Sequence, residues 1–165
     1  MRILAFLAVA ILLVTPTQAA ELGVPKGEIV LTVTGAIENT NAGETAVFDM
    51  EMLDALAART TRSTTPWYDG EVTFSGPLGS AILEAVGAKG SALTVTAIND
   101  YSAEIPVEDF TRYPVILANR LDGALMSVRE KGPLFVIYPF DVAPELVNEV
   151  YFTRSVWQVK SINVH

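Results

Sequence analysis

The sequence contains no cysteine and a single histidine, and these two gaps exclude several kinds of chemistry. Without cysteine there is no disulfide, no thiol nucleophile, no zinc–thiolate site and no iron–sulfur ligation. The one histidine, His165, is the last residue of the sequence, and a fraying terminus makes a poor metal ligand or general base. We therefore expect an exposed, uninvolved His165 and no catalysis of the Ser-His-Asp or Cys-His type.

Positive charge is also scarce. The sequence has 11 Lys and Arg residues against 19 Asp and Glu residues, for a net charge of −8, and it contains no basic cluster. A surface that follows a phosphate backbone needs such a cluster, so we expect no binding to nucleic acid. The acidic residues are spread along the chain rather than gathered in a tail, which is typical of a solvated surface.

Only one long apolar run occurs, the twelve residues Ile3–Val14. A transmembrane helix needs about 20 apolar residues, so this run is too short to be one. It follows a short positive start and precedes a stretch of small residues, which is the layout of a secretory signal peptide. We predict a signal peptide over residues 1–19, cleaved after Ala19 or Ala20, one domain over residues 20–165, and a periplasmic protein that is not embedded in the membrane. An uncleaved membrane anchor is the alternative.

The remainder of the chain mixes strand patterns with short helix patterns and shows no regular βαβ alternation. Asp49 is suited to N-cap a helix over Met50–Ala58, and Gly87 is suited to end a helix over Leu78–Val86. The pair Asn99-Asp100 favours a tight turn between two strands. This order predicts an α+β fold, a mixed sheet with short helices. Two more short helices are predicted over Pro106–Phe110 and Pro144–Val150. The predicted strands are Glu28–Thr34, Thr60–Trp67 (an edge strand or extended loop), Glu71–Phe74, Leu93–Ala97, Tyr101–Ile105, Val115–Ala118, Leu134–Tyr138 (a central strand) and Ser155–Val164.

Five short segments between Asp49 and the C-terminus follow one another in a distinctive order. They are Phe74–Leu78 with Ile82-Leu83 and Val86–Ala88, then Asn99–Pro106, then Val115–Ala118 with Asp122-Gly123, then Lys131–Leu134 with Tyr138-Pro139, and finally Arg154–Ile162. In this order they resemble the oxidoreductase molybdopterin-binding domain of the sulfite oxidase fold. The resemblance implies that fold, as a single molybdopterin-binding-like domain, and a pocket of the pterin type.

Catalytic members of that family bind molybdenum through a cysteine thiolate, upstream of the segment that begins here at Phe74. The corresponding region is the threonine-rich Thr60–Trp67, and a hydroxyl is a hard, poorly acidic donor that does not replace a thiolate on molybdenum. We therefore expect no bound molybdenum and a non-catalytic protein. The family also contains small exported proteins that bind a reduced pterin and report it to a membrane signalling enzyme. The missing cysteine and the TTPW segment resemble that branch.

A pterin is flat and polar, so its site needs an aromatic face for stacking and polar groups around the rim. Trp67 is the predicted stacking residue, with a core position as its alternative. Tyr101 either points into the pocket or packs across strands, and Asp100 is either the carboxylate that accepts from the ligand or a turn-forming residue. The predicted ligand-binding set is Thr65, Trp67, Asn99, Asp100, Tyr101 and Lys131, whereas the alternating pattern of the last strand predicts a buried Trp157.

Three functions remain open at this point. The main hypothesis is a periplasmic, non-catalytic protein that binds a reduced pterin and reports it to the periplasmic domain of a membrane signalling partner, a partner implied only by the resemblance. The alternative is a molybdopterin-dependent oxidoreductase or an accessory subunit of one. The third is a structural accessory with a degenerate pocket.

Overall fold

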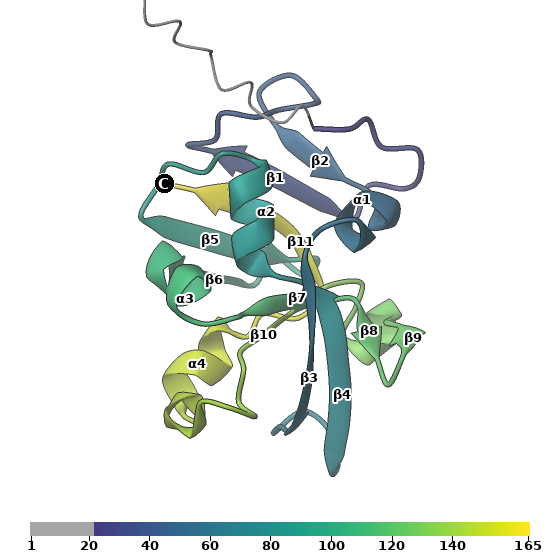
Figure 1. The fold of residues 1–165 in the computed structure, drawn as a ribbon, viewed down its shortest axis with the longest axis vertical. Helices are drawn as coiled ribbons and strands as arrows, with labels where there is room; N and C mark the ends of the chain where they lie inside the picture. Colours follow the sequence, from purple (N-terminus) through teal and green to yellow (C-terminus); the bar gives the residue numbers. More distant parts are fainter. Residues whose placement is uncertain (1–21) are drawn as a thin grey trace, which may run out of the picture.

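A computed structural model describes residues 22–165 as three sheets with short helices packed against and between them (Figure 1). The predicted α+β fold class is thereby confirmed. The predicted signal peptide, residues 1–19, lies outside the described residues. Within residues 22–165, every helix is too short or too polar to cross a membrane.

The largest sheet has five strands and joins the two ends of the described chain. Its central strand, β11, runs parallel to β1 on one side and antiparallel to β5 on the other. Buried apolar and half-exposed polar residues alternate along β1 and β5, as expected for strands with one covered face. In spatial order the strands are β2 (Ala46–Phe48), β1 (Leu31–Gly35), β11 (Val159–Val164), β5 (Ala92–Ala97) and β6 (Ser102–Pro106).

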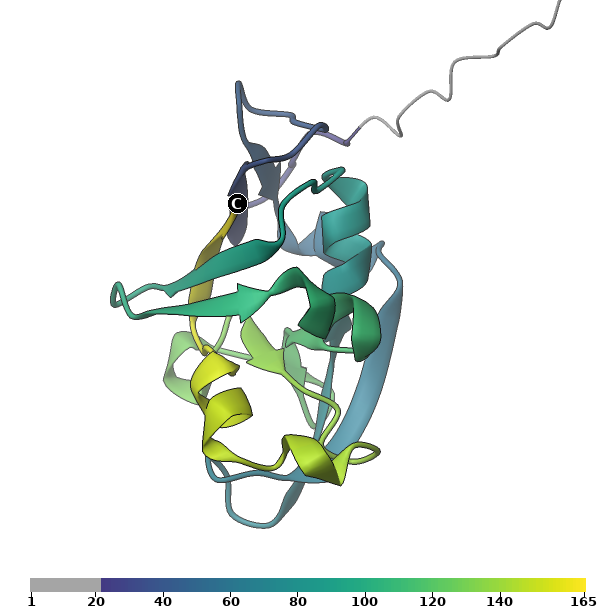
Figure 2. The ribbon, with the colours of Figure 1, turned by 90° about the vertical axis from the view of Figure 1, so that its left-hand side faces the viewer.

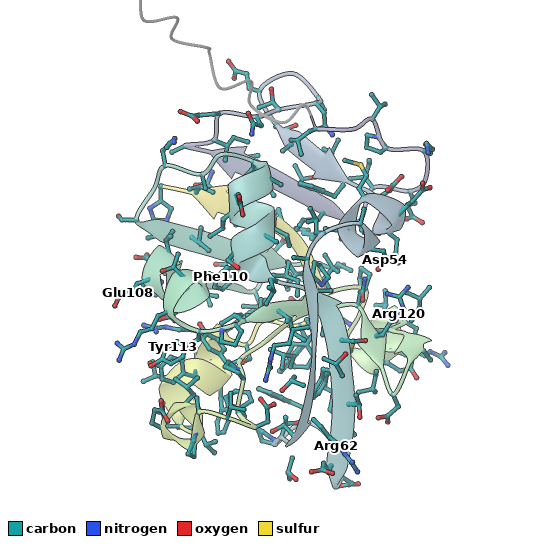
Figure 3. All side chains as sticks on the ribbon, in the orientation of Figure 1. Asp54, Arg62, Glu108, Phe110, Tyr113 and Arg120 are labelled. Carbon is teal, nitrogen blue, oxygen red and sulfur yellow. The ribbon has the colours of Figure 1, made fainter. Side chains whose placement is uncertain are left out.

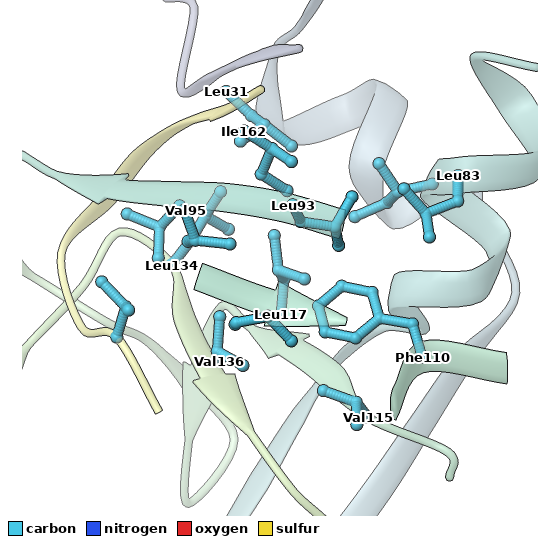
Figure 4. Close-up of a cluster of buried hydrophobic side chains, with 14 of the residues drawn as sticks. Leu31, Leu83, Leu93, Val95, Phe110, Val115, Leu117, Leu134, Val136 and Ile162 are labelled. Carbon is cyan, nitrogen blue, oxygen red and sulfur yellow. The ribbon is translucent and has the colours of Figure 1, made fainter. Parts of the chain in front are cut away.

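Helices α2 (Gly79–Ala85) and α3 (Val107–Arg112) contribute to the core beside this sheet (Figure 4). The core is mainly aliphatic here, and the ring of Phe110 of α3 lies among these side chains. Gly79 packs directly on the Phe110 ring, so that any side chain at position 79 would collide with it. The two helices are therefore held close together at the start of α2.

The four-stranded sheet forms an arm that extends away from the five-stranded sheet, and the buried two-stranded sheet lies near the centre of the molecule (Figure 1). Strand β3 (Ala58–Thr64) is an edge strand, as predicted, and pairs with β4 (Glu71–Pro77) over its whole length. Gly76 of β4 touches the backbone of β7 at Leu117, which leaves no room for a side chain at position 76. The remaining strands are β8 (Arg120–Leu121) and β9 (Ala124–Leu125), which continue the sheet of β3 and β4, and β7 (Ile116–Ala118) and β10 (Phe135–Ile137), which pair with each other.

A partly exposed polar contact links this arm to α1 (Met50–Asp54), which Asp49 caps as predicted by accepting from the backbone N–H of Met52. The Arg120 guanidinium donates to both oxygens of Asp54 at 2.7 and 2.8 Å. The fully buried Asn119 also donates to Asp54, at 2.8 Å. Figure 3 shows Asp54 and Arg120 facing each other across this junction.

Several predicted elements differ from the structure. The predicted central strand Leu134–Tyr138 is the shorter β10, which is fully buried but pairs with β7 alone. The helix predicted over Pro144–Val150 is divided into the 3-10 helix η2 (Pro144–Leu146) and α4 (Glu149–Arg154), because Asn148 adopts an extended backbone and caps α4. A further 3-10 helix, η1 (Val128–Glu130), precedes β10.

The last strand starts later than predicted, and this changes the position of Trp157. Gln158 has a positive φ of 52°, so the regular alternation begins only at Val159, where β11 starts. The prediction that Trp157 is buried was therefore wrong, since its side chain is 39% exposed. Strand β1 is also displaced, beginning at Leu31 rather than Glu28, and α1 ends at Asp54 because the chain soon enters β3.

Candidate ligand-binding site

A pocket of about 340 Å³ opens where the β5–β6 turn, α4 and the segment before β11 meet. In Figure 2 the β5–β6 hairpin projects above α4, and β6 contacts this helix. Segments distant in sequence therefore build the pocket, and Trp67 enters it from the loop after β3. The lining residues are Trp67, Ala97, Asn99, Tyr101, Glu149, Phe152, Thr153, Ser155 and Trp157.

Aromatic rings in edge contact form the base of the pocket. The Trp67 ring lies 5.0 Å from Phe135 and 5.7 Å from Phe152, both approximately perpendicular to it. Trp157 packs on the same Phe135 ring at 6.1 Å. Trp67 is half-buried and contacts both hydrophobic clusters, so it is at once a core residue and a wall of the pocket. Trp67 therefore packs in the core and borders the pocket, and its stacking on a ligand stays a prediction.

The rim of the pocket is polar and is fastened by two hydrogen bonds. The Tyr101 hydroxyl donates to the backbone oxygen of Thr153 at 3.1 Å, which bridges the β5–β6 turn and α4. The side-chain oxygen of Asn99 accepts from the backbone N–H of Tyr101 at 3.2 Å, which fixes the turn from within. Tyr101 is 47% exposed, so its ring forms an outer edge of the pocket rather than part of the core.

A buried polar network connects α4 to α3 and to Tyr138. The Tyr138 hydroxyl donates to Asp109 Oδ2 at 2.7 Å, and Arg154 Nη1 of α4 lies 2.8 Å from the same oxygen. Burial, followed by the hydrogen bond to Asp109, raises the pKa of Tyr138, so its hydroxyl remains a donor at neutral pH. Asp109 thus ties α4, and with it one side of the pocket, to α3 and the strand region before Pro139.

The structure brings together three of the six predicted ligand-binding residues, Trp67, Asn99 and Tyr101, which all line the pocket. Thr65 is buried, and its hydroxyl has no hydrogen-bond partner among residues 22–165. The other two predicted residues, Asp100 and Lys131, do not line this pocket and have partners elsewhere.

Asp100 lies at the β5–β6 turn with a positive φ of 66°, and its carboxylate is 2.6 Å from Lys160 Nζ. The hydrogen bond from Lys160 lowers the pKa of Asp100 below its usual range. Lys131 places its ammonium 4.6 Å from the centre of the Tyr68 ring, as a cation–π contact. His165 is exposed, as predicted, and its ring lies 3.0 Å from Thr94 Oγ1.

Sequence reasoning missed the contribution of α4 and of the segment after it. Glu149 and Phe152 are one helical turn apart on α4, and Ser155 and Trp157 follow the helix. The i, i+3 spacing of a charged and an aromatic residue was readable in the sequence, because residues so spaced share a helix face. Its relation to the β5–β6 turn, about 50 residues earlier, was not readable from any local pattern.

The donor chemistry does not fit a molybdenum–thiolate centre. The whole chain lacks cysteine, and the inner face of β3, with the loop that follows it, presents the buried hydroxyls of Thr61, Ser63 and Thr65 instead. Neutral hydroxyls are hard, weakly acidic donors and do not substitute for a thiolate on molybdenum. Within residues 22–165, no three His, Cys, Asp or Glu side chains converge as metal ligands would. The described residues therefore do not provide the ligands of a molybdenum–thiolate centre.

No protein-family model matches the sequence, and no curated protein matches it. Among solved structures, the chain is similar to the sulfane dehydrogenase SoxCD from Paracoccus pantotrophus, with a TM-score of 0.62 and 19% sequence identity. The similar region covers 82% of this chain and 37% of that chain, so this protein spans little more than a third of its length. The similarity confirms the predicted sulfite-oxidase-type fold, and at this identity it shows the fold alone.

Proposed function

We propose that this protein binds a pterin-type heterocycle in the pocket between the β5–β6 turn and α4, and that it acts as an accessory domain of a molybdopterin-dependent oxidoreductase without itself holding the metal. The observation that carries the proposal is a pocket with aromatic walls and a polar rim within a sulfite-oxidase-type fold. Its volume of about 340 Å³ lies within the usual range for small-molecule sites.

The walls suit a flat ring. Trp67 and Trp157 both pack on Phe135 and both line the pocket, and an aromatic ligand gains stacking energy beyond the area it buries. Asn99 and Tyr101 supply amide and hydroxyl groups at the rim, where the polar edges of a pterin would lie. Of the residues predicted from the sequence, Trp67, Asn99 and Tyr101 keep their proposed roles. Thr65, Asp100 and Lys131 would contribute only from outside the pocket wall.

The direct test is calorimetric titration of the protein with a reduced pterin such as tetrahydropterin under anaerobic conditions. We expect saturable binding with one ligand per chain, and a loss of roughly tenfold to hundredfold in affinity for Trp157→Ala. Val142→Ala, which changes an exposed residue away from the pocket, is the matched control and should bind as the unchanged protein does. Absence of binding to the unchanged, folded protein would overturn the proposal.

The non-metal role has its own test. Elemental analysis of protein purified from its native envelope, combined with detection of released pterin, should find pterin without a matching amount of molybdenum. One equivalent of molybdenum per chain would show instead that this protein carries a complete cofactor through ligands other than a thiolate.

A second candidate function is that of an exported reporter, which binds a pterin and then contacts the periplasmic domain of a membrane signalling protein. The observation that favours it is the apolar surface around the pocket, where Tyr101, Val150 and Trp157 are each between 39% and 55% exposed. A partner at that surface would sense whether the pocket is filled. N-terminal sequencing of envelope protein should then begin at Ala20 or Glu21, and an intact Met1 would overturn the export on which this role depends.

A further inference from the structure

Glu149 is the one charged residue that lines the pocket. It is the first residue of α4, and its exposed carboxylate makes no ion pair with any residue in the range 22–165. The other pocket-lining side chains are aromatic, small or neutral and polar. A free carboxylate beside aromatic rings favours a ligand that presents N–H donors at the edge of a flat ring.

The cations nearest in the chain are engaged elsewhere. Arg154 is paired with the buried Asp109, and Lys160 is paired with Asp100 outside the pocket. Since no Lys or Arg lines the pocket, a phosphate group on the ligand would meet a carboxylate without a compensating cation. The electrostatics of the site therefore favour a ligand without a phosphate group.

Asn99, on the β5–β6 turn, lines the same pocket as Glu149. Its side-chain oxygen is already occupied by the backbone N–H of Tyr101, so its amide NH2 is the group left to face a ligand. The two side chains thus combine an acceptor of two hydrogen bonds with a donor. This pattern matches the edge of a 2-amino-4-oxo ring, where an exocyclic amine and a ring N–H stand beside a carbonyl oxygen.

We propose that Glu149 and Asn99 are the specificity-determining residues of the pocket, and that they select unphosphorylated 2-amino-4-oxo pteridines. The carboxylate accepts from the exocyclic amine and the ring N–H, and the amide donates to the ring carbonyl. This inference rests on the proposed function, because it assigns the chemical class of the ligand in that same pocket. In this proposal the carboxylate of the site is Glu149 rather than Asp100, which is paired with Lys160.

Two rings of the same shape should bind to this pocket with different affinities. In a 2,4-dioxo pteridine such as lumazine, a carbonyl oxygen replaces the exocyclic amine and would face the Glu149 carboxylate, acceptor against acceptor. A site built to pair with an N–H group discriminates strongly against an analogue that lacks it, because its own polar group is then left unpaired. Stacking on Trp67 and Trp157 would be nearly the same for both rings.

The experiment compares three probes by competition calorimetry: 6-hydroxymethylpterin, its phosphate monoester and lumazine. We expect the unchanged protein to prefer the pterin over lumazine by about tenfold or more, and over the phosphate ester by several fold. Glu149→Gln should abolish or reverse the preference over lumazine, because a glutamine amide can donate to the carbonyl that replaces the amine. It should also weaken discrimination against the phosphate ester.

Glu104→Gln is the matched control, since it removes the same charge from a residue that borders a neighbouring surface hollow together with Glu149 but does not line this pocket. The pterin-to-lumazine ratio should be unchanged in this variant. Melting curves should be unchanged for both variants, because both side chains are exposed.

The outcomes separate this inference from the proposed function. If the unchanged protein binds pterin and lumazine equally, or if Glu149→Gln keeps the original ratio, the assignment of Glu149 is overturned while pteridine binding stands. If the unchanged protein binds neither ring, the proposed function itself fails.

Discussion

The five-stranded sheet and the region around the pocket are packed with different kinds of side chain. Between the sheet and α2, the core consists largely of Leu, Ile and Val residues, with near-zero exposure (Figure 4). Around the pocket, the contacts are between aromatic rings such as Trp67, Phe135 and Phe152, mostly edge to face. Branched aliphatic side chains interdigitate and fill space, whereas rings in edge contact leave ring faces uncovered.

The backbone of the five-stranded sheet is also more regular than the backbone around the pocket. Strands β1, β11 and β5 pair over most of their length, with one register shift between Val159 and Ser161, and this pairing fixes the buried side chains. The pocket is built instead from a turn, a six-residue helix and the irregular segment before Val159. The sheet is therefore the closely packed part of the molecule, whereas the aromatic region is less closely packed and contains the pocket. Each prediction below tests this division.

The largest effect is expected from the sheet. Leu93→Ala removes a fully buried side chain from β5, and the resulting cavity should lower the free energy of unfolding by about 3 kcal/mol. Denaturant unfolding measures this change, with Thr94→Ala, on the less buried side of the same strand, as the control. The variant should bind ligand normally where it is folded. A loss below about 1 kcal/mol would mean that the core tolerates the cavity by collapsing.

The network behind α4 should affect both regions. Asp109→Ala leaves the buried Tyr138 hydroxyl and Arg154 without their shared partner, and should cost about 3 kcal/mol of stability. Ligand affinity should also fall, because α4 loses its anchor. Tyr138→Phe removes one neutral donor and should cost about 1 kcal/mol. If Asp109→Ala weakened stability but left affinity unchanged, α4 would be positioned by its apolar contacts alone.

The two tryptophans should respond differently to truncation. Trp67→Ala should lower stability by about 3 kcal/mol and also weaken binding, because Trp67 packs on both hydrophobic clusters. Trp157→Ala should weaken binding with a stability loss nearer 1 kcal/mol, since this side chain is 39% exposed. Melting curves and titrations on both variants measure the two quantities. Equal stability losses would show that Trp157 belongs to the core after all.

The smallest effect on stability is expected from lowering the pH. The hydrogen bond from Arg120, supported by Asn119, holds the pKa of Asp54 below its usual range. A carboxyl whose pKa is lowered by folding stabilises the protein above its unfolded pKa of about 3.9, and this contribution is lost as the pH falls through the folded value. Because the pair is about a third exposed, we expect less than about 1 kcal/mol. Unfolding measured from pH 6 down to pH 3 should show a shallower decline for Asp54→Asn.

Local turn and capping chemistry explains why much of the fold was predictable. Asp49 caps α1, Gly87 with a positive φ ends the α2 region, and Asn99-Asp100 turns β5 into β6. Each of these signals acts within a few residues, so the sequence expresses it directly. The order of the five-stranded sheet is different, since β11 inserts between β1 and β5 through contacts that no local pattern encodes.

The site was only half predictable for the same reason. Trp67, Asn99 and Tyr101 belong to turns and loops recognisable in the sequence, and they line the pocket. Trp157 was assigned to the core because the alternating pattern was extended back through Gln158, whose positive φ interrupts it. Glu149 was missed because its relation to the turn depends on the docking of α4, which the long-range contact between Arg154 and Asp109 fixes.

The chain contains two tryptophans, and both line the same pocket. Tryptophan emission therefore originates at this pocket, with no background from tryptophans elsewhere in the protein. A heteroaromatic molecule stacked there would quench that emission, and the spectral shift would report how much water the site has lost. The tryptophan fluorescence of the unlabelled protein therefore reports both the filling of the pocket and the loosening of its walls.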